Sequence, residues 1–93
     1  MVVVHTRTWN VDISITEHED ERRTYATAVL HSGARTPLRG EGRARRRPSE
    51  MEVPEIGDEL ATARALADLA HQLLEVTAGD IEQFTQHPVH LAP

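Results

Sequence analysis

The sequence predicts a single α+β domain: a three-stranded antiparallel β-meander covered by a long C-terminal helix plus a short terminal helix. Two segments with alternating apolar and polar residues and one long segment with helical spacing carry this prediction. The chain has 93 residues, and two separate cores would each be too small to fold unaided. We therefore expect one domain over residues 1–93, with flexible tails at residues 1–8 and 87–93.

The first strand is expected from Trp9 to Ile15, where every second residue is apolar. Residues 17–21 are almost all acidic and form the expected turn, and residues 22–31 return to β-favouring side chains. A hairpin follows from this order. Two registers stay open for its second strand, because a slip by one residue exchanges the faces. The core-facing set is either Tyr25, Thr27 and Val29 or Ala26, Ala28 and Leu30.

The third strand is expected from Leu38 to Arg45, where small or apolar residues alternate with charged ones. Gly40 and Gly42 lie on one face of it, and glycines inside a strand indicate that another backbone comes close or that the strand bends. Residues 48–56 read as a connector. The long helix is expected to begin at Gly57–Asp58 and to end near Ala78–Gly79, after which a second, short helix begins.

Small side chains recur on the third strand and on the expected apolar face of the helix, which predicts an unusually close contact between them. The expected apolar face of the helix holds Leu60, Ala63, Ala67, Ala70 and Leu74. To the close contact the strand contributes Gly40, Gly42 and Ala44, and the helix contributes Ala63, Ala67 and Ala70. A Gly42→Leu substitution is therefore expected to cost soluble protein.

Composition excludes several classes of protein. All ten basic residues are arginine, fifteen residues are acidic, and the formal net charge is −5. The absence of cysteine excludes disulfide frameworks, thiolate catalysis and the usual structural zinc sites. No apolar run approaches the roughly 18 residues of a membrane span. We expect a cytoplasmic protein without a membrane partner.

The helical segment contains the run Ile56-Gly57-Asp58-Glu59-Leu60-Ala61, continued by Ala63-Arg64-Ala65-Leu66, Asp68-Leu69-Ala70, Gln72-Leu73, Asp80-Ile81-Glu82 and Pro88-Val89. With these residues the chain resembles, from about Asn10 to Val89, a family of small actinobacterial proteins classed as a domain of unknown function. The resemblance implies a fold akin to the double-stranded-RNA-binding domain (dsRBD-like). It implies no activity, cofactor or site residue.

Arginines are concentrated in one segment. Residues 33–48 hold six arginines and one acid, whereas the rest of the chain holds four arginines and fourteen acids. One hypothesis is that the Arg35–Arg47 strand binds RNA or DNA. Its arginines at odd-numbered positions would lie on one face of the strand; they are Arg39, Arg43, Arg45 and Arg47. The other is that these arginines are solvated positions that blunt a strand edge. Acidic residues stand at 17–21 and at the helix start, where a dsRBD needs cations, so nucleic acid is the less favoured partner.

Tyr25, Thr27 and Val29 lie on the opposite face from the helix if Ala26, Ala28 and Leu30 are in the core. Tyrosine and arginine are enriched at protein interfaces. A small hydrophobic core favours self-association, because a dimer buries more apolar surface. We therefore expect a non-enzymatic binding or regulatory protein that acts through protein–protein contacts as a homodimer. The candidate interaction residues are Tyr25, Val29, Arg39, Arg43 and Arg45.

The sequence offers little for catalysis or cofactor binding. Ser14, Ser32 and Ser49 lie outside any Gly-x-Ser-x-Gly elbow, and Gly40-Glu41-Gly42 lacks the third glycine of a dinucleotide fingerprint. Six histidines are scattered, and only His87 and His90 are close in sequence. We expect no enzyme activity, no cofactor and no metal.

Overall fold

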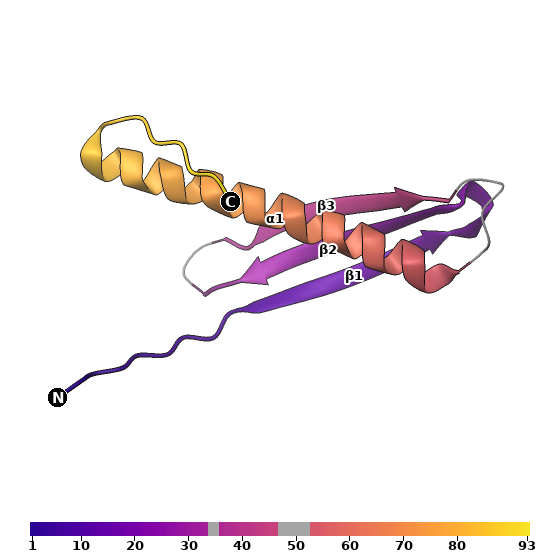
Figure 1. The fold of residues 1–93 in the computed structure, drawn as a ribbon, viewed down its shortest axis with the longest axis horizontal. Coiled ribbons are helices and arrows are strands. Elements are labelled where there is room, and N and C mark those ends of the chain that lie inside the picture. Colours follow the sequence, from indigo (N-terminus) through magenta and orange to yellow (C-terminus); the bar gives the residue numbers. More distant parts are fainter. Residues whose placement is uncertain (34–35, 47–52) are drawn as a thin grey trace.

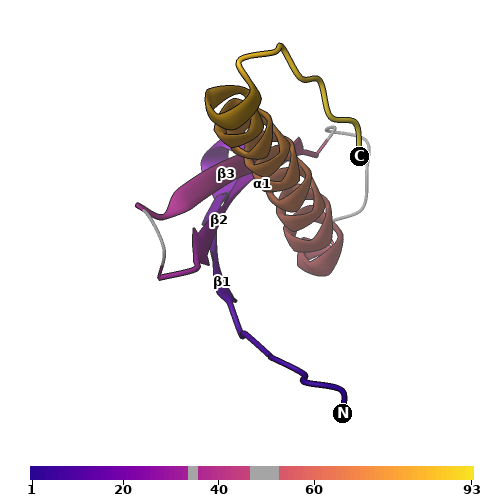
Figure 2. The ribbon, with the colours of Figure 1, turned by 90° about the vertical axis from the view of Figure 1, so that its left-hand side faces the viewer.

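The computed structural model describes residues 1–33, 36–46 and 53–93. The elements in chain order are β1 (Asn10–His18), a single 3-10 turn η1 (Glu19–Glu21), β2 (Arg23–His31), β3 (Leu38–Arg45) and α1 (Pro54–Thr85). The three strands form one antiparallel sheet with β2 in the centre, and α1 crosses one face of it obliquely (Figures 1 and 2). The predicted α+β arrangement is confirmed, and the third strand has the predicted bounds.

The hairpin pairs Ile13 with Ala28, and β3 pairs Gly40 with Ala28 on its other side. Because directly opposite residues share a face, this register decides the question that the sequence left open. The set that faces the core is Ala26, Ala28 and Leu30, all buried. Tyr25, Thr27 and Val29 point to the face that α1 does not cover. The first strand is longer than expected, since Glu17 and His18 continue its pairing with β2.

The close contact between β3 and α1 is present, but the helix meets the strand with other residues than expected. A Cβ atom at Gly42 would overlap the carbonyl oxygen of Ala61 and the backbone nitrogen of Ala65, and a Cβ at Gly40 would overlap the carbonyl oxygen of Ala65. Ala61 and Ala65 are fully buried, and Leu69 is nearly so. These residues follow one another at intervals of four and form the buried stripe of the helix.

The predicted helix face was wrong. Ala63, Ala67 and Ala70 are exposed, Leu60 is 41% exposed, and Leu74 is only half-buried. Alanine occurs on both sides of this helix, so helical periodicity alone does not select a face. Gly40 and Gly42 meet the backbone of Ala61 and Ala65, so the position of the helix on β3 decides which of its alanines are buried.

The helix is also longer than expected and uninterrupted. Pro54 occupies its first turn, where a missing N–H costs no hydrogen bond. Gly79 does not end it, and no separate short helix follows. The helix ends at Gln86, whose left-handed backbone (φ 58°) directs its N–H to the Glu82 carbonyl oxygen at 2.7 Å. Asp80 to Thr85 therefore form the last turns of α1 instead of a second element.

The described residues outside these elements form no further helix or strand. Residues 1–9 leave the sheet as an extended segment, and residues 86–93 turn back along the end of α1 (Figure 1). The Val89 N–H donates to Glu82 Oε1 at 2.7 Å, which attaches this returning segment to the helix. Within the part of the chain that the structure describes, no helix is both long enough and apolar enough to cross a bilayer.

Candidate interaction surface

The face of the sheet that α1 leaves uncovered is called the open face below. The strand registers determine which side chains belong to it, because cross-strand partners and alternate residues share a side. Its members are Asn10, Asp12, Ser14, Thr16 and His18 of β1, Arg23, Tyr25, Thr27, Val29 and His31 of β2, and Arg39, Glu41, Arg43 and Arg45 of β3. In Figure 2 the helix stands on the other side of the sheet.

Tyr25 lies at the centre of this face. Its cross-strand partners are Thr16 on β1 and Arg43 on β3. The His18 ring meets the Tyr25 ring edge to face, with 5.2 Å between centroids and 88° between planes. A side-chain hydrogen bond to Tyr25 raises the pKa of the Arg23 guanidinium above its ordinary value, with Coulombic attraction to the same side chain as the next cause. Tyr25 thus interacts with the His18 ring and with the Arg23 guanidinium.

The open face is basic although the chain as a whole is acidic. It carries four arginines, at positions 23, 39, 43 and 45, against the two acids Asp12 and Glu41. Arg39 Nε lies 3.7 Å from Glu41 Oε1, and His31 Nε2 lies 3.0 Å from Asp12 Oδ2. Among the described residues, Arg43 and Arg45 form no ion pair. Their guanidinium groups remain available to an anionic partner.

The structure brings together all five residues that the sequence nominated. Arg43 is directly opposite Tyr25, Arg39 is directly opposite Val29, and Arg45 is opposite Arg23. Arg35 and Arg47, which the nucleic-acid hypothesis also used, lie outside the described residues. Arg46 follows β3, where its N–H donates to the Arg22 carbonyl oxygen at 2.9 Å.

Sequence reasoning missed Arg23 as a member of this surface. Arg23 precedes Tyr25 by two residues, so it shares the face of Tyr25 in any strand that contains both. The alternation of side chains along the second strand was the signal that could have identified Arg23. The guanidinium that contacts Tyr25 therefore belongs with the five nominated residues.

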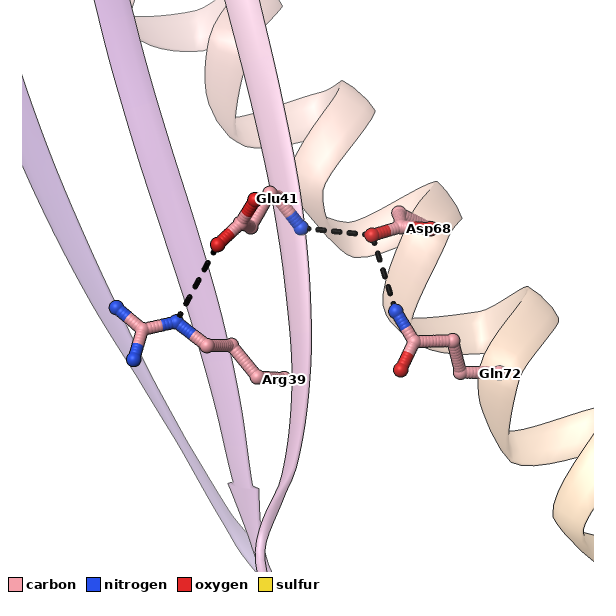
Figure 3. Close-up of polar contacts among 4 residues, drawn as sticks. All are labelled: Arg39, Glu41, Asp68 and Gln72. Atoms are coloured by element: carbon pink, nitrogen blue, oxygen red, sulfur yellow. Dashed lines mark hydrogen bonds and ion pairs between the residues drawn. The ribbon is translucent and has the colours of Figure 1, made fainter.

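Polar contacts to α1 hold β3 in place beneath this surface. The Glu41 N–H donates to Asp68 Oδ2 at 2.8 Å, and Gln72 Nε2 donates to the same oxygen at 3.1 Å (Figure 3). Arg64 donates to the Arg43 carbonyl oxygen at 2.8 Å. These side chains bond the β3 backbone at the two residues whose side chains stand beside Thr27 and Tyr25 on the open face.

A cavity of about 510 Å³ opens at the end of the sheet, beneath the first turns of α1. Thr24, Ala44, Ile56 and Leu60 are among its lining residues, and acidic and basic side chains share its rim. Its size is that of a small-molecule pocket. No group of three or more potential metal ligands occurs among the described residues.

Comparison with known proteins places the chain among mycobacterial relatives. The Rv2632c-like family model matches residues 7–90. "Uncharacterized protein Rv2632c" of Mycobacterium tuberculosis is 48% identical over 83 residues, which cover 89% of this chain and 86% of the relative. "Uncharacterized protein Mb1767" of Mycobacterium bovis is 47% identical over 83 residues, covering 89% and 85%. These relatives confirm the resemblance to an actinobacterial family of unknown function.

A solved structure has the same fold. The "Crystal Structure of Rv2632c" aligns with a TM-score of 0.80 at 46% sequence identity, and covers 91% of this chain and 98% of that chain. The names of these relatives state no activity, ligand or partner. Function has to be argued from the surface of this chain.

Proposed function

The chain belongs to the Rv2632c-like family, and from this premise we propose that it is a non-enzymatic binding protein that acts through protein–protein contacts as a homodimer. The open face is the surface that binds the partner protein. The recognised feature is an acidic patch on that partner, because β2 and β3 carry four arginines on the same face as Tyr25 and Val29.

One observation carries this proposal: a basic, tyrosine-centred face on an acidic chain. With a net charge of −5, an even mixture of charges would make the open face negative. It instead holds four arginines and two acids. Arginine and tyrosine are the residue types that most often contribute binding energy at protein interfaces. Charge complementarity then directs an acidic protein surface to this face.

A non-enzymatic role fits the chemistry of the same face. Its hydroxyl groups are those of Ser14, Thr16, Thr27 and Tyr25. Among the described residues, none of the three aliphatic hydroxyls hydrogen-bonds a histidine or carboxylate that would activate it as a nucleophile. Of the described residues of the open face, Arg23 and Arg45 line the cavity at the end of the sheet, and the rest of the face is one side of an open sheet.

Titration with defined anionic probes tests this function. We expect a poly-glutamate peptide at low salt to shift the backbone amide NMR signals of β2 and β3. Arg43→Ala should weaken that binding about tenfold, since hydrogen bonds to charged groups contribute about 1.5–3 kcal/mol. Arg7→Ala is the matched control, because it removes the same charge from the exposed N-terminal segment. An absence of shifts on the open face, or equal weakening by both variants, would contradict the proposal.

A nucleic-acid binder is the second candidate, because Arg39, Arg43 and Arg45 also suit phosphate. It requires steeply salt-dependent retardation of RNA or DNA, weakened by Arg43→Ala combined with Arg45→Ala. We further infer a dsRBD-like fold from the family resemblance, but two of the positions at which such domains bind RNA are unsuited here. The β1–β2 turn is Glu19–Glu21, and the first turn of α1 contains Glu55. Strong RNA retardation without poly-glutamate binding would favour this candidate.

A further inference from the structure

The edge of β1 is exposed along its whole length. We propose that the β1 strands of two chains associate antiparallel about a twofold axis at Ile13, which joins their sheets into one of six strands. This inference rests on the proposed homodimer and deepens it, because it assigns the dimer interface to a surface other than the open face.

The helix-facing side chains of β1 are apolar and lack a cover. Val11, Ile13 and Ile15 are directly opposite Leu30, Ala28 and Ala26, which are buried under α1. The three β1 side chains nevertheless remain 41%, 38% and 44% exposed, because α1 lies over β2 and β3 and hardly reaches β1 (Figure 2). We call these three residues the β1 shelf. A row of half-exposed β-branched residues beside a formed core favours an additional contact.

The outer edge of β1 is also suited to accept another strand. Among the described residues, no side chain or backbone group bonds the outer backbone edge of β1. Between Asn10 and Thr16 the strand has one charged residue, Asp12, and no proline. Strand edges that must stay free carry charges, prolines or bulges that block pairing. The β1 edge has almost none of these protections over seven consecutive residues.

The monomer exposes more surface than its mass explains. The chain exposes 7544 Å², whereas the scaling for compact monomers gives about 5,400 Å² at 10.4 kDa. The radius of gyration is 17.5 Å, against about 12 Å for a compact chain of this length. The N-terminal segment and the projecting end of α1 supply part of the excess of about 2,100 Å². A standard interface needs about 800 Å² from each partner, which is less than this excess.

Symmetry and charge select the register. With the axis at Ile13, each Ile13 faces its copy and Val11 faces Ile15 of the partner subunit, so all six shelf side chains meet on one side. On the other side Asp12 faces the partner's Ser14. No like charges are opposed in this register. A shift of the axis to Asp12 would place two Asp12 carboxylates directly opposite each other, which costs stability.

This pairing leaves the open face available. A twofold axis perpendicular to the sheet keeps both α1 helices on one side and both open faces on the other. Pairing two open faces directly would instead bring their arginine clusters together, and like-charge contacts oppose such an interface. In the proposed dimer the two β3 strands are the outermost strands, so the arginines of each copy lie far from those of its partner.

Cysteine crosslinking tests the interface without background, since the chain has no cysteine. In the proposed register the two Cα atoms at position 13 are about 4.5–5.5 Å apart, within the range that a disulfide bridges. We expect Ile13→Cys to form a disulfide-linked dimer under mild oxidation. Val11→Cys is the matched control on the same strand face. Its two copies lie more than about 13 Å apart along the strands and should stay reduced.

Light scattering on the full-length protein supplies the second readout. We expect wild type and Arg43→Ala at twice the chain mass of 10.4 kDa. Ile13→Arg places two arginines directly opposite each other at the twofold axis. Their repulsion should raise the dimer dissociation constant about a hundredfold or more. Circular dichroism should show that this variant keeps its helix, because position 13 is half-exposed in the monomer.

The outcomes separate this inference from the proposed function. A wild-type dimer in which Ile13→Cys stays reduced, or which Ile13→Arg leaves intact, would overturn the β1 interface and leave the homodimer standing. Crosslinking of Val11→Cys but not Ile13→Cys would overturn the register. A wild-type protein that stays monomeric at high concentration would overturn both the interface and the dimer of the proposed function.

Discussion

The two outer strands of the sheet, β1 and β3, have nearly equal length but different surroundings. α1 crosses β3 at close range, where Gly40 and Gly42 admit its backbone, and Asp68 and Arg64 bond the strand's Glu41 N–H and Arg43 carbonyl groups. β1 has no such neighbour among the described residues, and its whole length is exposed. Two backbone groups of the β3 edge are thus bonded within the chain, whereas α1 bonds none of those on the β1 edge among the described residues.

This difference shows how composition directs the placement of the helix. A helix packs closest where both surfaces are small, and Gly40 and Gly42 make β3 the smallest surface of the sheet. The β-branched side chains of the β1 shelf keep a helix backbone at a distance. The residues that stabilise β3 against α1 are therefore absent from β1, and a second chain is needed to cover it.

The largest expected effect comes from filling the contact at β3. Gly42→Leu would place a branched side chain where even a Cβ overlaps the Ala61 and Ala65 backbone. We expect loss of soluble, folded protein, because overpacking of this size forces the helix off the sheet. Gly79→Ala is the control, since no atom lies within 4 Å of that Cβ. It should raise the free energy of unfolding by up to about 1 kcal/mol. Normal thermal unfolding of Gly42→Leu would contradict the contact.

Sequence reasoning found this contact from one side only. Two glycines at alternate positions of a strand are a local signal, and they correctly predicted close approach of a second backbone. The matching helix residues had no comparable signal, because Ala61 and Ala65 have the same side chain as Ala63 and Ala67. Only the position of the helix relative to β3 distinguishes them, and that position depends on contacts between residues far apart in the chain.

The open face was predictable for a related reason. Alternation along the second strand places Tyr25 and Val29 on one face, and alternation along the third strand does the same for Arg39, Arg43 and Arg45. A single assumption about which face of the sheet is buried then puts both groups on the same surface. The hydrogen bond between Asp68 and Glu41 joins residues 27 positions apart. No sequence pattern in either segment predicts it. Local periodicity thus predicted the surface, but it did not predict the bonds that hold its outer strand.

A smaller effect is expected at that bond. Asp68→Ala removes the acceptor of the Glu41 N–H and of Gln72 Nε2, and should lower the free energy of unfolding by about 1 kcal/mol. Water can reach the vacated N–H, so the loss stays well below that of a buried group. Asp68→Asn keeps an acceptor oxygen and should recover much of the stability in urea unfolding. If Asp68→Ala unfolds at the wild-type urea midpoint, the side chain does not support the β3 edge.

The smallest effect is expected on β1, where two register partners allow a direct comparison. Val11 and Leu30 are opposite each other on the helix-facing side, but Val11 is 41% exposed and Leu30 is 8% exposed. Val11→Thr in dilute protein should change the free energy of unfolding by less than about 0.5 kcal/mol, as exposed substitutions do. Leu30→Ala should cost about 2–5 kcal/mol, because it leaves a cavity in the core.

Protein concentration sharpens this last comparison. Wherever two chains associate through β1, dimerisation stabilises the folded state by mass action, and Val11 becomes part of a covered surface. The stability difference between wild type and Val11→Thr should therefore grow with protein concentration, whereas the cost of Leu30→Ala should stay constant. A Val11→Thr penalty that is already as large as that of Leu30→Ala in dilute solution would mean that α1 covers β1 within one chain. The contrast between the two sheet edges would then be lost.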